Sequence, residues 1–192
     1  MLDMPTATAR TQRVAGLISP ELCATATSYL RIKAEVGEMQ LGDGHVHNSY
    51  ASYADLLMEV ILQQSQPQVE QAIGTGLLPT YSYARLYANG DQLTPHTDRP
   101  ACEVTVTVLL GADTARPWPI FIRTPDGVDE ITLSPGDALI YPGPQFEHWR
   151  ERFDGRWQAQ LTLHYVRAEG PDAGWRFDKR PGLGRHPGTR RA

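Results

Sequence analysis

The stretch LPTYSYARLYANGDQLTPHTD, residues 78–98, sets the pattern for the second half of the chain. A tyrosine-rich run leads into the turn signal Asn89-Gly90-Asp91, and a second short extended run follows. Short runs of this kind, bounded by Gly, Pro, Asn and Asp, predict β-strands joined by tight turns. The same pattern recurs as far as residue 166, and it predicts strands over 80–87, 103–110, 120–124, 130–133, 138–141 and 158–166.

The chain before this stretch has a helical pattern. Ser19-Pro20-Glu21 combines a capping residue, a proline suited to the first helical position and an acidic side chain at the positive end of the helix dipole. We therefore expect a helix over 20–36. Apolar residues at helical spacing predict another over 53–66, and Pro67 separates it from a short third helix over 69–73.

These patterns predict a single, mainly β domain with N-terminal helices, in which a sandwich or barrel is buttressed by the helices. Residues 1–77 would form a loose leader, up to residue 13, and the supporting helices. Residues 78–166 would form the β core. Residues 167–192 carry more Lys and Arg than Asp and Glu, so we interpret them as a solvated basic tail, disordered from residue 182, in preference to a docking arm.

The composition excludes several classes of protein. The 192 residues are 41% hydrophobic and 21% charged, which is typical of a soluble globular domain. A net charge of −4 argues against a nucleic-acid partner. No apolar run is long enough to span a membrane, and residues 1–13 lack the apolar segment of a signal peptide. Two cysteines, Cys23 and Cys102, cannot form a disulfide framework, so we expect a cytoplasmic location.

The candidate chemistry lies in Pro95-His96-Thr97-Asp98. On an extended backbone, residues two positions apart share a face, so His96 and Asp98 would present an imidazole and a carboxylate to one point. His148, which follows a predicted strand and turn, is a third candidate ligand. Two histidines and one carboxylate leave half of a metal's coordination sphere open, as in non-haem Fe(II) oxygenases. The alternative is a chance pair of hydrogen-bonded structural residues.

The tyrosine-rich run adds a second signal. Tyr81, Tyr83, Arg85 and Tyr87 alternate along the predicted strand and so share one face. A buried tyrosine hydroxyl or arginine guanidinium needs a hydrogen-bond partner, which an apolar core does not provide. This face therefore predicts a pocket that holds an anion, although core tyrosines remain the alternative. His45 and His47 follow a turn without a third ligand in register, and we expect them to be exposed.

Over residues 78–166 the sequence resembles the Fe(II)/2-oxoglutarate-dependent oxygenases, in particular their prolyl-4-hydroxylase-like branch. The resemblance rests on an ordered set of motifs: the tyrosine-bearing strand, Asn89-Gly90-Asp91, His96-Thr97-Asp98, Pro135-Gly136-Asp137-Ala138-Leu139-Ile140-Tyr141, His148, Gly155-Arg156-Trp157 and His164-Tyr165-Val166. It implies a double-stranded β-helix, a cupin-like jelly roll. It also implies an iron site made of His96, Asp98 and His148, with 2-oxoglutarate and O₂ as cosubstrates.

The resemblance further implies hydroxylation of a C–H bond in a small molecule or in a peptide or protein residue, with release of succinate and CO₂. Tyr87 stands where related oxygenases place a tyrosine that binds 2-oxoglutarate. The family also places a basic residue on the strand after the second histidine. Arg156 lies slightly closer to His148 than this pattern requires, and position 158 is a glutamine. We therefore name Arg156 first and Arg85 second as the clamp of the distal carboxylate.

A cupin-like module that binds a metal or a small molecule without oxygenase turnover is the alternative function, because Arg156 is out of register. Arg150 and Arg152 are interpreted as loop or rim residues. The sequence contains no pattern that identifies the substrate or the oligomeric state.

Overall fold

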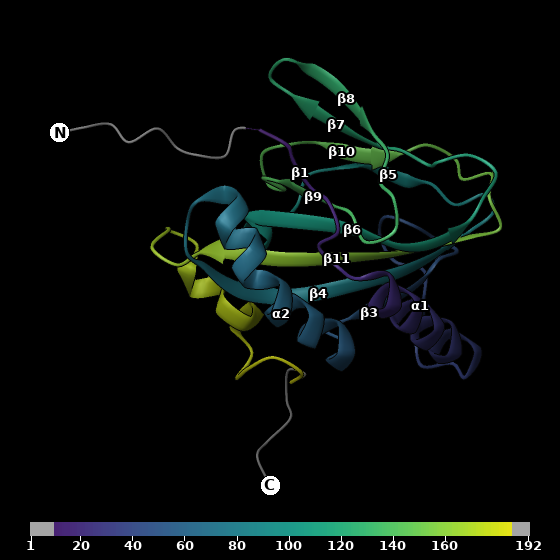
Figure 1. Cartoon of the computed structure of the whole chain (residues 1–192), viewed down its shortest axis with the longest axis horizontal. Helices are drawn as coiled ribbons and strands as arrows, with labels where there is room; N and C mark the ends of the chain where they lie inside the picture. The colour runs from purple at the N-terminus through teal and green to yellow at the C-terminus, as the bar shows by residue number, and fades with distance from the viewer. Residues whose placement is uncertain (1–9, 186–192) are drawn as a thin grey trace, which may run out of the picture.

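The computed structural model describes residues 10–185, and two antiparallel β-sheets face each other at its centre (Figure 1). The larger sheet has the strand order β1-β9-β6-β11-β4-β3-β2, and the smaller has the order β5-β10-β7-β8. The larger sheet contains β1 (Gln12–Val14), β2 (Gln40–Leu41), β3 (Tyr50–Tyr53), β4 (Leu77–Ala88), β6 (Val104–Asp113), β9 (Ala138–Tyr141) and β11 (Trp157–Arg167). The smaller sheet contains β5 (Leu93–His96), β7 (Ile120–Thr124), β8 (Gly127–Ile131) and β10 (His148–Arg150).

The chain crosses repeatedly between the two sheets. It passes from β4 in the larger sheet to β5 in the smaller, returns to β6, crosses to β7 and β8, returns to β9, crosses to β10 and ends in β11. This alternation winds the strands into a double-stranded β-helix, and the predicted fold class is confirmed. The predicted ranges of β7 and β9 match the observed strands residue for residue.

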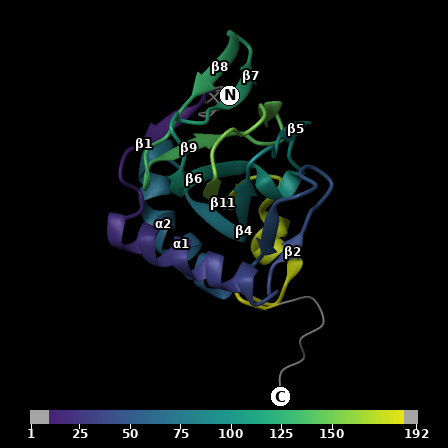
Figure 2. The ribbon, with the colours of Figure 1, turned by 90° about the vertical axis from the view of Figure 1, so that its right-hand side faces the viewer.

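Two α-helices cover the outer face of the larger sheet, as Figures 1 and 2 show. Helix α1 (Pro20–Glu35) is capped by Ser19, whose hydroxyl accepts from the Leu22 amide at 3.3 Å. Helix α2 (Leu56–Ile73) is capped by the Asp55 carboxylate. Apolar faces of both helices join the sheet in one buried cluster, and two 3₁₀ segments, η1 (Pro100–Cys102) and η2 (Ala173–Lys179), complete the elements. No helix among the residues that the structure describes is both long and apolar enough to cross a bilayer.

Pro67 does not end a helix, contrary to prediction, and α2 runs through it. The proline lies on the exposed side of the helix, where water can satisfy the carbonyl that loses its partner. The opposite side, with Leu62, Ser65 and Val69, stays buried across the proline. Packing against the sheet therefore outweighs the local cost of one missing hydrogen bond.

Both ends of the described chain are more ordered than the sequence predicts. Gln12–Val14, at the end of the predicted leader, pairs with β9. The segment after β11 is not a solvated tail, because it packs against the core and the Arg180 side chain is buried. Within the stretch predicted to be disordered, residues 182–185 are part of this packed segment, and the rest lies outside the described residues.

Strand β4 separates the helix-covered core from the space between the sheets. Ala84 and Leu86 belong to the cluster beneath the helices. The alternate residues, Tyr81, Tyr83, Arg85 and Tyr87, face the other way and line a cavity. The alternation read from the sequence thus places this face where the pocket was predicted.

Candidate active site

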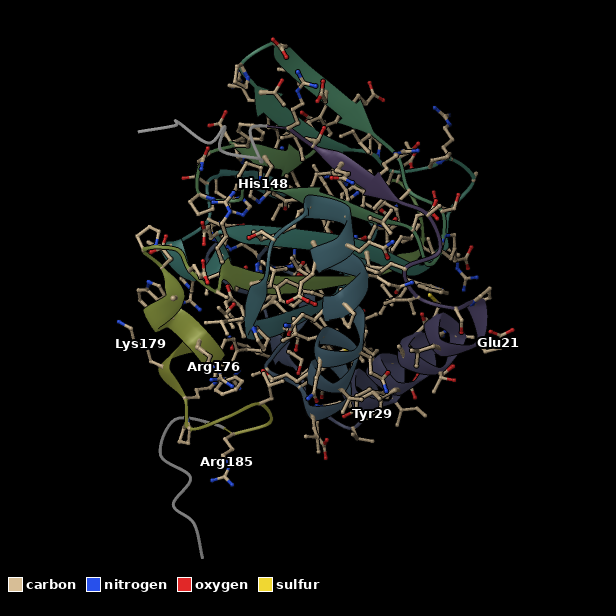
Figure 3. All side chains as sticks on the ribbon, turned by 60° about the vertical axis from the view of Figure 1, so that its left-hand side comes forward. Glu21, Tyr29, His148, Arg176, Lys179 and Arg185 are labelled. Atoms are coloured by element: carbon tan, nitrogen blue, oxygen red, sulfur yellow. The ribbon has the colours of Figure 1, made fainter. Side chains whose placement is uncertain are left out.

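Strands β5 and β10 bring the three candidate ligands together. The two strands pair antiparallel with His96 opposite His148, and Asp98 follows just after β5. Asp98 Oδ1 lies 3.8 Å from His96 Nε2 and 3.7 Å from His148 Nε2. Two ligand atoms at about 2.1 Å from one metal ion are at most about 4.2 Å apart, and both of these distances lie within that limit. All three atoms lie within 4.8 Å of one another, which makes them a candidate site for a single ion. His148 lies between the two sheets (Figure 3).

Backbone contacts set the orientation of both imidazole rings. His96 Nδ1 lies 2.8 Å from the carbonyl of Thr94, and His148 Nδ1 lies 2.9 Å from that of Phe146. A carbonyl only accepts, so each Nδ1 carries the proton and each Nε2 keeps its lone pair. Burial also lowers the pKa of His96, which favours the neutral ligand. The rings are therefore prepared for metal binding.

Asp98 is held by its second oxygen. Thr105 Oγ1 donates to Asp98 Oδ2 at 2.8 Å, which leaves Oδ1 directed at the two histidines. The Asp98 amide donates to the carbonyl of Gly143 at 3.0 Å. A Cβ at position 143 would overlap both Asp98 Oδ2 and Thr105 Oγ1. Glycine is needed there because the carboxylate lies directly against the backbone.

The three ligands open onto a cavity of about 460 Å³ between the sheets, a size suited to a small organic ligand. Its walls come from β4, β6, β9 and β11 of the larger sheet and from β5, β7 and β10 of the smaller. The charged side chains that line it are Asp43, Arg85, Asp98, Arg99 and Arg150. An octahedral metal held by two imidazoles and one carboxylate would have three free positions, and the cavity provides room for other ligands there.

Arg150 is the feature that the sequence analysis missed. It lies on β10 two residues after His148, is 3% exposed, and lines the cavity. One guanidinium nitrogen donates to the Trp118 carbonyl at 2.7 Å, but no carboxylate in the described part of the chain pairs with it. Burial lowers its pKa. A buried cation without a counter-ion costs several kcal/mol, so this position calls for an anion.

Two tyrosines complete this anion subsite. Tyr87 and Tyr141 are buried side chains whose rings border the cavity near Arg150. Burial raises the pKa of both phenols, so they stay protonated and can donate. Neither hydroxyl hydrogen-bonds to any residue within 10–185, and a carboxylate in this part of the cavity could accept from both. The spacing of two residues between His148 and Arg150 could have identified Arg150 from the sequence, because residues two apart on a strand share a face.

The other two arginines that we considered as the clamp are already engaged. The Arg156 side chain is 83% exposed and pairs with Asp113 at 2.9 Å outside the cavity, so the first choice is corrected. Strand β11 begins at Trp157, and the residues of this strand that line the cavity, from Gln160 onward, all follow Arg156. Arg85 does line the cavity, but its guanidinium pairs with Asp43 at 2.5 Å and donates to Ser49 at 2.8 Å.

Asp43 ties the loop before β3 to the cavity wall. Besides Arg85, it accepts from the Tyr83 hydroxyl at 2.6 Å and from the His45 amide at 2.9 Å. His45 is exposed, as predicted, yet its ring stacks on that of His96 with centroids 4.2 Å apart. Sequence reasoning gave this histidine no role, because nothing local indicates that its loop folds over the candidate metal ligands.

No protein-family model matches the sequence, and no curated protein was found to match it. Solved structures do match the fold. A prolyl-4-hydroxylase from Pseudomonas putida superposes with a TM-score of 0.68 at 16% identity, covering 82% of this chain and 92% of that one. A Trichoplax adhaerens prolyl hydroxylase in complex with a hypoxia inducible factor peptide fragment has a TM-score of 0.68 at 11% identity, covering 88% and 86%.

The epimerase SnoN, in complex with Fe³⁺, alpha ketoglutarate and nogalamycin RO, has a TM-score of 0.68 at 15% identity and covers 92% of this chain and 88% of its own. The chain has the fold of these 2-oxoglutarate/Fe(II) oxygenases. Two of these proteins are prolyl hydroxylases by name and the third is an epimerase, so the shared fold leaves the reaction to be argued from the residues of this site.

Proposed function

We propose that this protein is a non-haem Fe(II)- and 2-oxoglutarate-dependent dioxygenase that hydroxylates a C–H bond of a small molecule or of a peptide or protein residue, releasing succinate and CO₂. The proposal rests on two features that occur together in one cavity. This cavity contains three ligand atoms arranged around the space for one metal ion, and a buried arginine, Arg150, without a counter-ion. A metal ion would bind the three ligand atoms, and a dianion that binds beside it would supply the counter-charge that Arg150 lacks.

The donor set fits iron. Two neutral imidazoles and one carboxylate form the triad that non-haem Fe(II) oxygenases use, and Fe(II) bound there supplies the redox chemistry that activates O₂. His96, Asp98 and His148 would hold the ion from the β5 and β10 side. Thr105 would keep the Asp98 carboxylate oriented through its hydrogen bond.

The anion subsite fits the distal carboxylate of 2-oxoglutarate. We propose Arg150 as its clamp, in place of Arg156, because a buried guanidinium offers a carboxylate two parallel hydrogen bonds. The hydroxyls of Tyr87 and Tyr141 would donate to the same carboxylate. Arg85 would act as a positioning residue that holds Asp43 and its loop against the cavity.

The free thiols of Cys23 and Cys102, both buried, support a cytoplasmic location. The net charge of −4 supports a substrate other than nucleic acid.

Anaerobic spectroscopy tests the proposal. Addition of 2-oxoglutarate to the Fe(II)-loaded protein should produce a visible absorption band from chelation of the metal, and admission of O₂ should then yield succinate. His96→Ala and Asp98→Ala should lose both signals. Iron binding without any response to 2-oxoglutarate would instead support the cupin-like binding module. Near-normal succinate formation in either variant would refute the assigned ligand triad.

A further inference from the structure

The segment after β11 contacts two residues that line the cavity, Arg99 and Tyr53. Asp178 receives two hydrogen bonds of 2.7 Å from the Arg99 guanidinium, and the Tyr53 hydroxyl also donates to its carboxylate. Burial alone would raise the pKa of Asp178, but these hydrogen bonds lower it. Arg99 directly follows Asp98 and lies over the ring of Tyr81, with its guanidinium carbon 4.6 Å from the centroid. We call residues 173–180 the strap.

The strap is held in an unusual conformation. Phe177, Asp178 and Lys179 have φ of 53°, 56° and 60°, although none of them is glycine. The left-handed region costs such residues about 1–2 kcal/mol each, so it persists only where surrounding contacts impose it. Figure 3 labels Lys179 and Arg176 on this segment, which lies against β4 and β11. The conformation directs the Asp178 carboxylate at Arg99.

A buried ion pair anchors the strap. Arg180 donates to Glu59 of α2 and to the Thr80 carbonyl of β4, the latter at 3.0 Å. The side chains of Arg180 and Glu59 are each only 1% exposed. The Gly184 amide donates to the second Glu59 oxygen. The strap is thus fixed to both layers of the core, which holds the backbone of Asp178 beside Arg99.

The same compensation occurs elsewhere in the cavity lining, where Asp43 neutralises Arg85. Only Asp98 and Arg150 then remain among the charged cavity residues that the structure describes. In the proposed function, the charges of Asp98 and the 2-oxoglutarate dianion balance those of the iron and Arg150. The loaded cavity would therefore carry no net charge toward a substrate.

The hydroxyls of three tyrosines that line the cavity are also engaged by other protein atoms. The hydroxyl of Tyr53 bonds Asp178, that of Tyr83 bonds Asp43, and that of Tyr81 lies 3.0 Å from the Cys102 sulfur. The rings of Tyr53 and Tyr81 pack with centroids 5.1 Å apart. What these side chains offer a ligand is the carbon surface of their rings, which suits another ring.

We propose that the substrate group entering this cavity is uncharged and carries a ring, and that the Arg99–Asp178 pair selects it over anionic analogues. The inference rests on the proposed function and adds the chemical class of the substrate. An anion would either remain without a cationic partner or have to displace Asp178 from its bidentate pair with Arg99, whose side chain is 42% exposed, and both alternatives disfavour it.

Benzamide and benzoate test the selection, since they share a ring and differ in charge. Their binding is measured by calorimetry on anaerobic protein loaded with Fe(II) and saturating 2-oxoglutarate, which keeps benzoate out of the Arg150 subsite. We expect the wild type to bind benzamide at least about tenfold more tightly, a difference of about 1.4 kcal/mol. In Asp178→Asn, Arg99 loses its counter-charge, and the ratio should fall to about threefold or less because benzoate gains affinity.

Asparagine is isosteric and tolerates the left-handed conformation, so the strap should stay in place. Asp172→Asn is the matched control: it removes the same charge from the same segment without contacting Arg99, and the ratio should not change. Arg99→Gln should keep the preference for benzamide, because it removes the cation that Asp178→Asn would free for benzoate.

The outcomes separate the two proposals. The absorption band of 2-oxoglutarate on iron is recorded on the same samples, and its absence would overturn the proposed function together with this inference. A normal band with equal binding of the two probes by the wild type would overturn the inference alone. So would an unchanged ratio in Asp178→Asn.

Discussion

His148 and Arg150 lie two residues apart on the same face of β10, and both side chains point into the cavity between the sheets. One three-residue strand thus presents a proposed metal ligand and a buried cation side by side. The separation along the strand is about 6–7 Å, since each residue rises about 3.3 Å. A keto acid that chelates the metal at one end could reach the arginine with the other.

Replacement of Arg150 by methionine tests this relationship through stability as well as turnover. Since Arg150 is buried without a counter-ion, Arg150→Met should be at least as stable as the wild type in the absence of ligand. The 2-oxoglutarate-dependent rise in Tm of the metal-loaded wild type should disappear in the variant. The apparent KM for 2-oxoglutarate should rise by more than about tenfold, as loss of a charge-assisted pair exceeds about 1.4 kcal/mol.

Arg156→Ala is the control for this experiment. Its side chain is exposed and pairs with Asp113 at the surface, so KM and Tm should stay close to the wild-type values. A tenfold rise in KM for Arg156→Ala, with Arg150→Met unaffected, would return the clamp to the residue that the sequence suggested first.

The sequence predicts the parts of the site that follow local rules. Alternation along β4 placed Tyr81 and Tyr87 on the cavity face, and the spacing of His96 and Asp98 singled out two of the three residues that cluster. Residues two positions apart on a strand share a face, and this alternation counted from His148 singles out Arg150. A three-residue strand between turns, however, gives no strand signal of its own in the sequence.

The parts that escaped prediction depend on contacts distant in the chain. Arg180 reads as one charge in a basic tail, and its partner Glu59 lies on a helix predicted from apolar spacing alone. Likewise Asp43 belongs to a turn, and only tertiary structure brings it to Arg85. The composition gives the number of charged residues, but it does not show which of them form ion pairs.

Gly143 is predicted to be essential for metal binding. In Gly143→Ala the new Cβ would overlap Asp98 and Thr105, so the carboxylate must rotate away from the histidines. We expect the affinity for Co(II), measured by its visible spectrum, to fall at least about tenfold, in line with other losses of ligand orientation. Gly174→Ala, in open space and at an ordinary φ, should bind Co(II) normally. Equal affinities for the two variants would contradict the assigned role of Gly143.

The buried pair between Glu59 and Arg180 should make a large contribution to stability. Removing one partner leaves an uncompensated buried charge, which costs about 3–5 kcal/mol, so Glu59→Leu should lower the free energy of unfolding by that amount. Replacing both residues, with Arg180→Met added, should recover a large part of the loss. Urea titration of the wild type, the two single variants and the double variant measures this. Two single losses that simply add in the double variant would show that the residues do not act as a pair.

His164 should make the stability of the metal-free protein depend on pH. The ring is buried in β11 beside Tyr81, and desolvation lowers its pKa from the usual 6.5 to about 4. The unfolded chain therefore binds a proton at this residue between about pH 6.5 and 4, where the folded chain does not. Stability is fully present above pH 6.5 and falls as the pH drops toward 4, by up to about 3 kcal/mol. Urea unfolding across this range should show a shallower slope for His164→Asn than for the wild type, whereas His47→Asn, at an exposed site, should keep the wild-type slope. A wild-type slope in His164→Asn would mean that this imidazole is not the group that acid must protonate.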